Sequence, residues 1–398
     1  GGAMTRIVLD ISRLISRVRH ARPSGVDRVE MAYARGLAAR YGDALDFAAV
    51  HPTGLYGRLA RETAHAYLDT LAKRWTDPDN TQGERSIASV LPWMKRLMPQ
   101  RGGVGTAKAL VQVSPHHLHD SGKMKRIFDQ EKARFVCLIH DLIPIEFPEY
   151  ARPGGAATHE KRMETVATLA DAVIANSAAT KASFEHWANV RGARVPPIDV
   201  ALLGTERLPS VAPLKEATPY FVCLGTVEPR KNHLLLLHQW RHMARTLRSD
   251  AIPRLKIIGR RGWENEQVID LLERSPAIAP HIDEINNCSD NELAAILKGA
   301  SGLLMPSFSE GYGMPIAEAL AAGTPVIASD IAAHREAGGD VPDFLDPLDG
   351  PGWQKAILDY AKDGQQRQAQ VERLGAWRAP EWSAHLDVAQ SVIDRISA

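Results

Sequence analysis

Short apolar runs, each bounded by polar or glycine-rich turns, recur along the chain and alternate with stretches of helical periodicity such as "NELAAILKGA" and "MPIAEALAAG". Runs that are apolar on both faces and alternate with helices are typical of parallel sheets covered on both sides. The runs lie at 6–12, 46–50, 109–114, 135–142, 171–177 and 198–204, and then at 220–227, 254–260, 302–307 and 325–330. Two such series predict an α/β chain with two doubly wound, Rossmann-like domains whose ligands bind beyond the carboxyl ends of the strands.

The proline-containing stretch 205–219 separates the two series. We therefore expect an N-terminal domain over 4–205 and a C-terminal domain over 206–378, with residues 1–3 the scar of a cleaved tag before Met4. The stretch 54–108 interrupts the alternation with two amphipathic segments. It is either an ordinary helical insertion that packs its apolar face on the core, which we favour, or an element that contacts a membrane surface or the acceptor.

Composition narrows the class of protein further. The 398 residues exceed the usual size of a single core, and 48 Lys and Arg against 47 Asp and Glu give no reason to expect nucleic acid as a partner. The three cysteines, Cys137, Cys223 and Cys288, lack metal-ligand spacing and are expected to be small core residues in a reducing compartment, the cytoplasm. The first residues, "TRIVLDIS", are too short and too polar a run for a signal peptide or a membrane span.

The stretch "SFSEGYGMPIAEAL" places Glu310 and Glu318 eight residues apart, with glycines between them. Pro315 favours a helix start, so we expect Glu310 in the loop after a strand and Glu318 in the first helical turn. Glycines let the backbone approach a ligand, and amides at a helix start suit a diphosphate. One glutamate would bind a sugar and the other a ribose diol. The alternative is that Glu318 complements the helix dipole and Glu310 is solvated.

A second stretch, "GTVEPRKNH" at 225–233, places Arg230 and Lys231 just after an apolar strand. At the carboxyl end of a strand, such a pair can bind an anionic ligand through the paired donors of arginine and the point charge of lysine.

Together these stretches resemble retaining GT-B glycosyltransferases of family 4, with their glutamate, seven residues, glutamate motif. The stretches "SDIAAHREAGGD" (329–340) and "CSDNELAAILKGAS" (288–301) are also similar to family patterns. In the N-terminal half, "IHDLIPIEFPEY" (139–150) and "VIANSAAT" (173–180) resemble the branch that contains lipopolysaccharide mannosyltransferases. The resemblance covers nearly the whole chain and implies two domains facing a central cleft, with the helix over 379–398 crossing back onto the N-terminal domain.

The resemblance implies roles for single residues. His140 would lie near the transferred sugar, with Asp141 as an orienting residue, and Gly25 would bring amides toward the donor phosphates. The backbone of Gly311, Tyr312, Gly313 and Met314 would add to the grip on the donor, beside Arg230, Lys231, Glu310 and Glu318.

The loop that contains Gly25 is longer than the usual form of the family and basic, with Arg17, Arg19, Arg22 and Arg28. It is either a solvated basic loop or a site for an anionic acceptor such as a lipid diphosphate.

Two stretches suggest metal at first sight. "SPHHLHD" offers His116, His117, His119 and Asp120, but the spacing is not that of a recognised zinc site, and a contact to the acceptor or a plain loop is favoured. The "DPD" at 77–79 imitates a metal-binding pair of another glycosyltransferase fold and follows a predicted helix, so we set it aside. We expect no metal and no cofactor.

The resulting hypothesis is an enzyme, either free in the cytoplasm or peripheral at the inner face of the membrane, that moves a hexose from a nucleotide sugar to a glycan or lipid-diphosphate-linked acceptor with retention of configuration. GDP-mannose is the preferred donor, and other GDP-, dTDP- or UDP-sugars are alternatives, because "GRRGW" (259–263) and "INNCS" (285–289) do not identify a base. An epimerase or hydrolase of the same fold would need carboxylates for proton abstraction or water activation, which the sequence does not point out. A non-catalytic subunit that binds a glycan or acts as a scaffold would be expected to lack the donor residues that this chain keeps.

Overall fold

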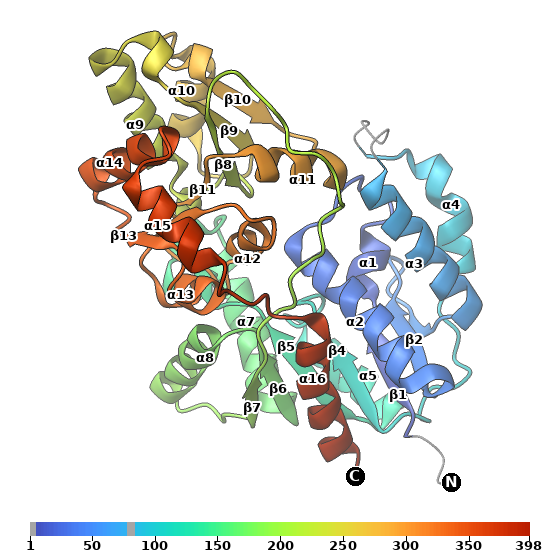
Figure 1. Cartoon of the computed structure of the whole chain (residues 1–398). Helices are drawn as coiled ribbons and strands as arrows, with labels where there is room; N and C mark the ends of the chain where they lie inside the picture. The colour runs from blue at the N-terminus through green and yellow to red at the C-terminus, as the bar shows by residue number, and fades with distance from the viewer. Residues whose placement is uncertain (1–4, 78–83) are drawn as a thin grey trace. The chain divides into compact units, whose positions relative to one another are not determined.

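The computed structural model describes residues 5–77 and 84–398 and divides into two compact units (Figure 1). The first unit contains the described residues up to Ile145, together with Gly154–Gly204 and Pro380–Ala398. The second contains Glu146–Pro153 and Thr205–Ala379. The main boundaries lie within one residue of those expected from the sequence, whereas the short segment 146–153 belongs to the second unit rather than to the first.

The described residues of the first unit form a seven-stranded sheet in the order β3-β2-β1-β4-β5-β6-β7. Only β3 among them runs antiparallel to its neighbour. The strands are β1 (Ile7–Asp10), β2 (Leu45–Val50), β3 (Tyr56–Arg58), β4 (Ala109–Gln112), β5 (Arg134–Ile139), β6 (Ala172–Ala175) and β7 (Ile198–Val200).

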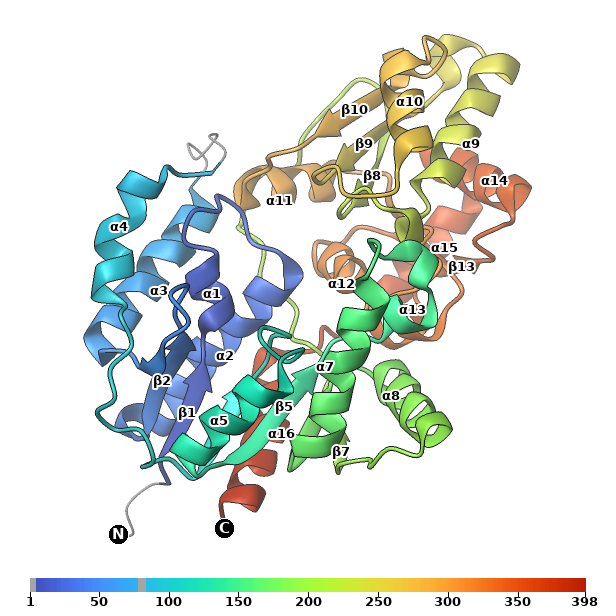
Figure 2. The same ribbon diagram turned by 180° about the vertical axis from the view of Figure 1, so that it is seen from behind.

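Helices cover both faces of this sheet. They are α1 (Ser12–Ser16), α2 (Gly25–Tyr41), α3 (Arg61–Thr76), α4 (Ile87–Arg96), α5 (Ser121–Glu131), α6 (Ile143–Glu146), α7 (Gly155–Leu169), α8 (Ala178–Arg191) and α16 (Trp382–Ser397). The last helix, α16, packs beside α2 on one face, and α5 packs beside α7; Figure 2 shows α5 and α7 in front of the sheet and α16 behind it. The C-terminal helix therefore belongs to the fold of the first unit.

Three polar contacts of His385 hold α16 in this place. The Tyr33 hydroxyl lies 2.6 Å from His385 Nε2, and His385 Nδ1 lies 3.1 Å from the carbonyl oxygens of Ala201 and Leu202. Both His385 and Tyr33 are almost fully buried, so these polar groups are paired where water does not reach them.

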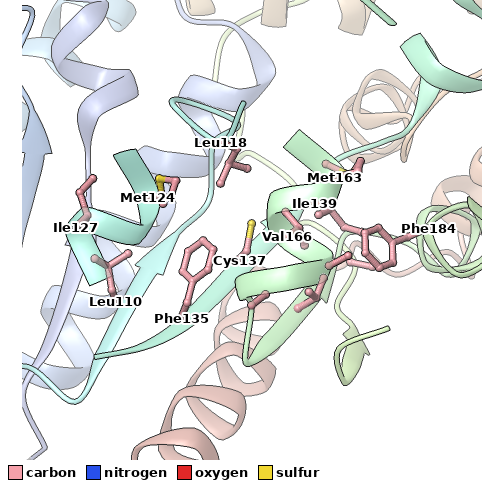
Figure 3. Packing of buried hydrophobic residues seen from close by; sticks show 14 of the residues in the cluster. Leu110, Leu118, Met124, Ile127, Phe135, Cys137, Ile139, Met163, Val166 and Phe184 are labelled. Atoms are coloured by element: carbon pink, nitrogen blue, oxygen red, sulfur yellow. The ribbon is translucent and has the colours of Figure 1, made fainter. Parts of the chain in front are cut away.

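The core of the first unit lies between the sheet and its helices. Figure 3 shows Phe135 and Cys137 of β5 packed against Met124 of α5 and Val166 of α7. Cys137 and the Cys223 of the second unit are buried, as expected, and burial raises the pKa of each thiol to about 12. Cys288 is half-buried, which corrects the expectation that all three cysteines are core residues.

All residues of the second unit are described, and they form a six-stranded parallel sheet in the order β10-β9-β8-β11-β12-β13. Its strands are β8 (Tyr220–Leu224), β9 (Arg254–Ile258), β10 (Ile282–Ile285), β11 (Gly302–Met305), β12 (Val326–Ser329) and β13 (Asp343–Leu345). Its helices are α9 (His233–Thr246), α10 (Glu266–Arg274), α11 (Asp290–Gly299), α12 (Met314–Ala321), α13 (Ala332–Gly338), α14 (Gly350–Ala361) and α15 (Gln365–Leu374).

The strand order determines which face of the sheet each helix of this unit covers. The chain moves from β8 to β9 in one direction along the sheet and from β11 to β12 in the other. Because crossover connections are right-handed, α9 and α10 cover one face, and α12 and α13 cover the opposite face. The neighbouring strands β8 and β11 are therefore the switch point, where loops diverge and ligands bind in doubly wound sheets.

All ten apolar runs of the sequence form strands, which confirms the predicted alternation. The pattern missed β3, β10 and β13, which are sheet edges of three or four residues. An edge strand pairs on one side only and stays partly exposed, so it does not need a continuous apolar run.

The 54–108 insertion divides into two different helices. α3 buries Tyr67, Leu68 and Leu71, as expected for a helix that packs on the core. α4 buries only Val90 among its residues, while Ile87 is 62% exposed and Leu91 46% exposed. α3 therefore packs on the core as the favoured view expects, whereas α4 packs through Val90 and Trp93 and leaves Ile87 and Leu91 exposed. In the part of the chain that the structure describes, no helix has the length and apolar character needed to cross a membrane.

Candidate active site

Two loops meet at the switch point of the second sheet. After β8, Pro229 begins a short 3-10 turn, Pro229–Lys231, and Asn232 ends it in the left-handed region with φ 60°. The Asn232 side-chain amide donates hydrogen bonds of 3.0 Å to the carbonyls of Pro306 and Pro347, beyond β11 and β13. The turn that carries Arg230 and Lys231 is thereby attached to the loops of two other strands.

Glu310, in the loop after β11, joins these two cations. Its Oε1 accepts a hydrogen bond of 2.6 Å from Lys231 Nζ and one of 2.9 Å from the Ser307 hydroxyl. Its Oε2 lies 2.7 Å from a guanidinium nitrogen of Arg230. The backbone amide of Phe308 donates to the Arg230 carbonyl at 2.8 Å. Three residues that the sequence analysis singled out, Arg230, Lys231 and Glu310, therefore form one cluster, and Glu310 is not solvated.

The charges of this cluster balance. Glu228 is the second carboxylate and pairs with the Arg230 guanidinium, so two cations face two anions. Burial alone would raise the pKa of Glu310, but Arg230 and Lys231 outweigh burial and hold it well below its usual range. Burial raises the pKa of Glu228 in spite of the same two cations. Glu310 is therefore ionised at neutral pH, and both of its carboxylate oxygens act as hydrogen-bond acceptors.

The backbone turns sharply before α12. Gly313 has φ 95°, and a Cβ there would lie 3.2 Å from His334 Cδ2, so this position favours glycine on both counts. Met314 is the first helical residue and Pro315 the second, as expected near a helix start. Glu318 is consequently the fifth residue, and the first turn of α12 contains no acidic residue, which corrects the expected placement.

The remaining donor residues of this loop differ in exposure. Gly311 and Glu318 are half-buried. Tyr312 is 3% exposed, so its ring is part of the core of the second unit.

In the first unit, His140 follows β5 as expected. Its Nε2 lies 2.7 Å from the Val113 carbonyl, and its own carbonyl accepts from the Asn176 side-chain amide at 3.0 Å. Burial lowers the pKa of its imidazole. Asp141 accepts a hydrogen bond from the Ile143 amide at 3.0 Å, in keeping with an orienting residue. The contact of His140 with a sugar stays a prediction.

Gly25 is the first residue of α2, behind the cap residue Ser24. The buried Asp27 carboxylate accepts from the Ser24 amide at 2.8 Å and pairs with Arg13 at 2.8 Å and Arg17 at 3.0 Å. The sequence analysis missed Arg13 and Asp27, although an acidic residue three places after a serine is a capping signal.

The other arginines of this loop are also engaged. Arg22 donates to the Trp75 carbonyl at 2.8 Å, and Arg19 donates to the Arg85 carbonyl at 2.8 Å. These bonds fasten the loop to the insertion, so it is not the freely solvated loop that was one of the two alternatives.

The histidine-rich loop after β4 shows no metal-binding geometry. Among the described residues, no three side chains of His, Cys, Asp or Glu are grouped to hold an ion. Burial lowers the pKa of His116 to about 4 and that of His117 to about 3, and Asp120 caps α5. Of the "DPD" sequence, Asp77 ends α3, and residues 78 and 79 lie outside the described residues.

Comparison with known proteins identifies the second unit. Residues 205–341, which contain the whole Arg230–Lys231–Glu310 cluster, match the family described as "Glycosyl transferases group 1". This part of the chain is a group 1 glycosyltransferase domain. The family resemblance noted in the sequence is confirmed.

Curated relatives that this chain is similar to include mannosyltransferases. The chain is 26% identical over 220 residues to the "Serotype-specific mannosyltransferase WbdA" of Escherichia coli, covering 51% of this chain and 27% of WbdA. It is 32% identical over 166 residues to the "O-antigen chain mannosyltransferase B" of Escherichia coli, covering 41% of this chain and 42% of that protein. The matches thus span less than half of each relative's length.

Solved structures extend the likeness to the whole chain. Sucrose-phosphate synthase from Thermosynechococcus elongatus superposes with a TM-score of 0.63 at 17% identity and covers 99% of both chains. Anabaena HepE in complex with UDP gives a TM-score of 0.59 at 13% identity, covering 98% of this chain and 99% of HepE. At such identities the likeness shows the fold, which is GT-B, as expected.

Proposed function

We propose that this chain is a glycosyltransferase that moves mannose from GDP-mannose to a glycan or lipid-linked acceptor in the synthesis of a bacterial surface polysaccharide. The observation that carries the proposal is the cluster of Arg230, Lys231 and Glu310 at the switch point of the group 1 domain. The preference for mannose rests on the names of two relatives, the mannosyltransferase WbdA and the O-antigen chain mannosyltransferase B.

The cluster suits the leaving group of such a reaction. Arg230 and Lys231 are 21% and 10% exposed, so their charges are only partly screened by water. In the proposed reaction they turn from Glu310 toward the donor diphosphate and stabilise the charge that grows there as the glycosidic bond breaks. The amides of Gly311 and Gly313 add to that grip.

In this proposal Glu310 binds the transferred sugar. Once the cations face the diphosphate, its ionised carboxylate accepts hydrogen bonds from sugar hydroxyls and orients the ring. Glu318 binds the ribose diol. The acceptor hydroxyl attacks the face from which the diphosphate leaves, and a phosphate oxygen of the donor takes its proton. This course retains configuration and uses no metal.

Acceptor and location are part of the same proposal. A lipid-linked acceptor lies at a membrane surface, and we place the enzyme in the cytoplasm, peripheral to the inner face of the membrane. The exposed Ile87 and Leu91 of α4, together with Lys95 and Arg96 on the same helix, support such a contact.

The test is a thermal-shift panel of GDP-, UDP- and dTDP-sugars with and without EDTA, followed by an assay of transfer. A ligand at a hundred times its dissociation constant adds about 2.7 kcal/mol to the free energy of unfolding. We expect a shift with GDP-mannose that EDTA does not change, and its loss in Lys231→Ala but not in the exposed control Lys362→Ala. A shift with UDP- or dTDP-sugars alone would refute the donor, and no shift with any donor would refute the transferase.

A further inference from the structure

A cavity of about 750 Å³ lies in the second unit, where α9 and α10 begin. Its lining includes Glu228, His233, Asn265 and Asp270, together with the rings of Tyr150 and Phe308. Both helices cover the face of the sheet opposite to α12, the helix that carries Glu318. Figure 1 labels α9 and α10 side by side at the end of this unit. The cavity adjoins the candidate active site, because Glu228 and Phe308 line it and both contact Arg230. Arg230, Lys231, Glu310 and Glu318 themselves do not line it.

One wall of the cavity is aromatic. The rings of Tyr150 and Phe308 stack with centroids 5.9 Å apart and planes 14° apart. The Trp263 indole donates a hydrogen bond of 2.7 Å to the Tyr150 carbonyl, and the Phe308 amide is bonded to Arg230. Both rings are thus attached to the second unit by backbone hydrogen bonds. Flat aromatic surface of this kind packs against the apolar C–H face of a sugar ring.

His233 supplies an unused polar group. It is the first residue of α9 and is 1% exposed, and among the described residues neither of its ring nitrogens has a hydrogen-bond partner. Burial, helped by the charge of Lys231, lowers the pKa of this imidazole to about 4, so the ring is neutral at neutral pH. A neutral imidazole offers one donor and one acceptor, which is the pair that a hydroxyl group completes.

The charge of the lining selects against anions. The lining contains the four carboxylates Glu228, Glu264, Glu266 and Asp270, and no Lys or Arg stands among its residues, all of which the structure describes. Such a wall repels a nucleotide or a phosphate and accepts hydrogen bonds from neutral hydroxyls.

From the aromatic wall, the unpaired imidazole and the acidic rim, we infer that this cavity is a second binding site, for a neutral hexose oligosaccharide. The inference rests on the proposed function for the origin of the ligand, which is a stretch of the acceptor or product glycan. The site would keep the growing chain attached to the enzyme through the second unit, on residues that take no part in binding the donor.

The test measures binding of α-linked mannotriose and maltotriose to the full chain by saturation-transfer NMR, beside thermal shifts with GDP. The variants are Phe308→Leu, which removes the ring and keeps an apolar side chain, and His233→Phe, which removes both nitrogens and keeps a ring. Leu348→Ala, at a position 77% exposed in the same unit, is the control. We expect each variant to weaken binding of the trisaccharide about tenfold, as for the loss of one good contact, while the control and the GDP shift stay unchanged.

The outcomes separate this inference from the proposed function. A GDP shift without binding of either trisaccharide, or binding that both variants leave intact, would overturn the cavity as a glycan site and leave the transferase standing. Binding that both variants weaken, without any shift from GDP or its sugars, would support the cavity and count against the transferase. Loss of the GDP shift in both variants would overturn the separation of the cavity from the donor residues.

Discussion

Replacing Glu310 with glutamine removes one charge from the balanced cluster of the group 1 domain and keeps the size of the side chain. Arg230 still pairs with Glu228 in this variant, so the loss falls mainly on Lys231. Lys231 is 10% exposed, and its ion pair among the described residues is with Glu310. Breaking a buried ion pair by removing one partner costs about 3–5 kcal/mol, and we take the lower end, about 3 kcal/mol, because Lys231 keeps some contact with water.

The assay is differential scanning calorimetry of the full chain at neutral pH and low salt. In a domain of 150–250 residues, 1 kcal/mol corresponds to about 2–4 °C, so we expect the transition of the second unit to fall by roughly 6–12 °C. Glu273→Gln is the matched control, because Glu273 is 53% exposed in its pair with Arg261 and should cost less than about 1 kcal/mol.

The pH dependence gives a second check. The pKa of Glu310 is lower in the folded chain than in the unfolded chain, where it is about 4.3. Its contribution is therefore fully present above about pH 4.3 and is lost as the pH falls through the folded value. The difference between the wild type and Glu310→Gln should be constant near neutrality and should narrow in acid. The reasoning is refuted if Glu310→Gln melts like Glu273→Gln at neutral pH.

Three further predictions concern the pKa of His385 in α16, the contact of Gly204 with Trp382, and the binding of the donor nucleotide by Glu318. Burial lowers the pKa of His385 to about 4, whereas it is about 6.5 in the unfolded chain, so the free energy of unfolding falls as the pH falls between these values. In urea unfolding, His385→Gln should reduce this dependence of the free energy on pH. Gly204→Ala places a Cβ 2.1 Å from the Trp382 ring and should cost about 1–3 kcal/mol in the same assay, unlike Gly102→Ala, which meets nothing within 4 Å. Glu318→Gln should weaken GDP roughly tenfold to hundredfold by calorimetric titration and leave 2′,3′-dideoxy-GDP unchanged.

Each of these can fail in a definite way. If the free energy of unfolding of His385→Gln falls as steeply between about pH 6.5 and about pH 4 as that of the wild type, the pKa of this histidine does not differ between the folded and the unfolded chain. Equal midpoints for the two alanine variants would mean that the indole moves aside without cost. An equal loss of affinity for both nucleotides would show that Glu318 does not bind the ribose diol.

The sequence by itself determined ten of the strands and three of the residues that form the candidate cluster. Apolar runs near five residues long, separated by helical periods, predicted ten strands that the structure contains, because a strand buried on both faces has to be apolar at successive positions. The motif residues Arg230, Lys231 and Glu310 could be selected for the same local reason, since each follows the end of such a run.

Only the tertiary structure decided which of these groups meet. Lys231 and Glu310 are 79 residues apart in the chain and come together because β8 and β11 are neighbours, which strand order decides and local pattern does not. The place of Tyr150 in the second unit and the exposed apolar side chains of α4 also depend on what packs against them. Periodicity shows which residues need an apolar or charged neighbour. The long-range pairing of strands decides which residue that neighbour is.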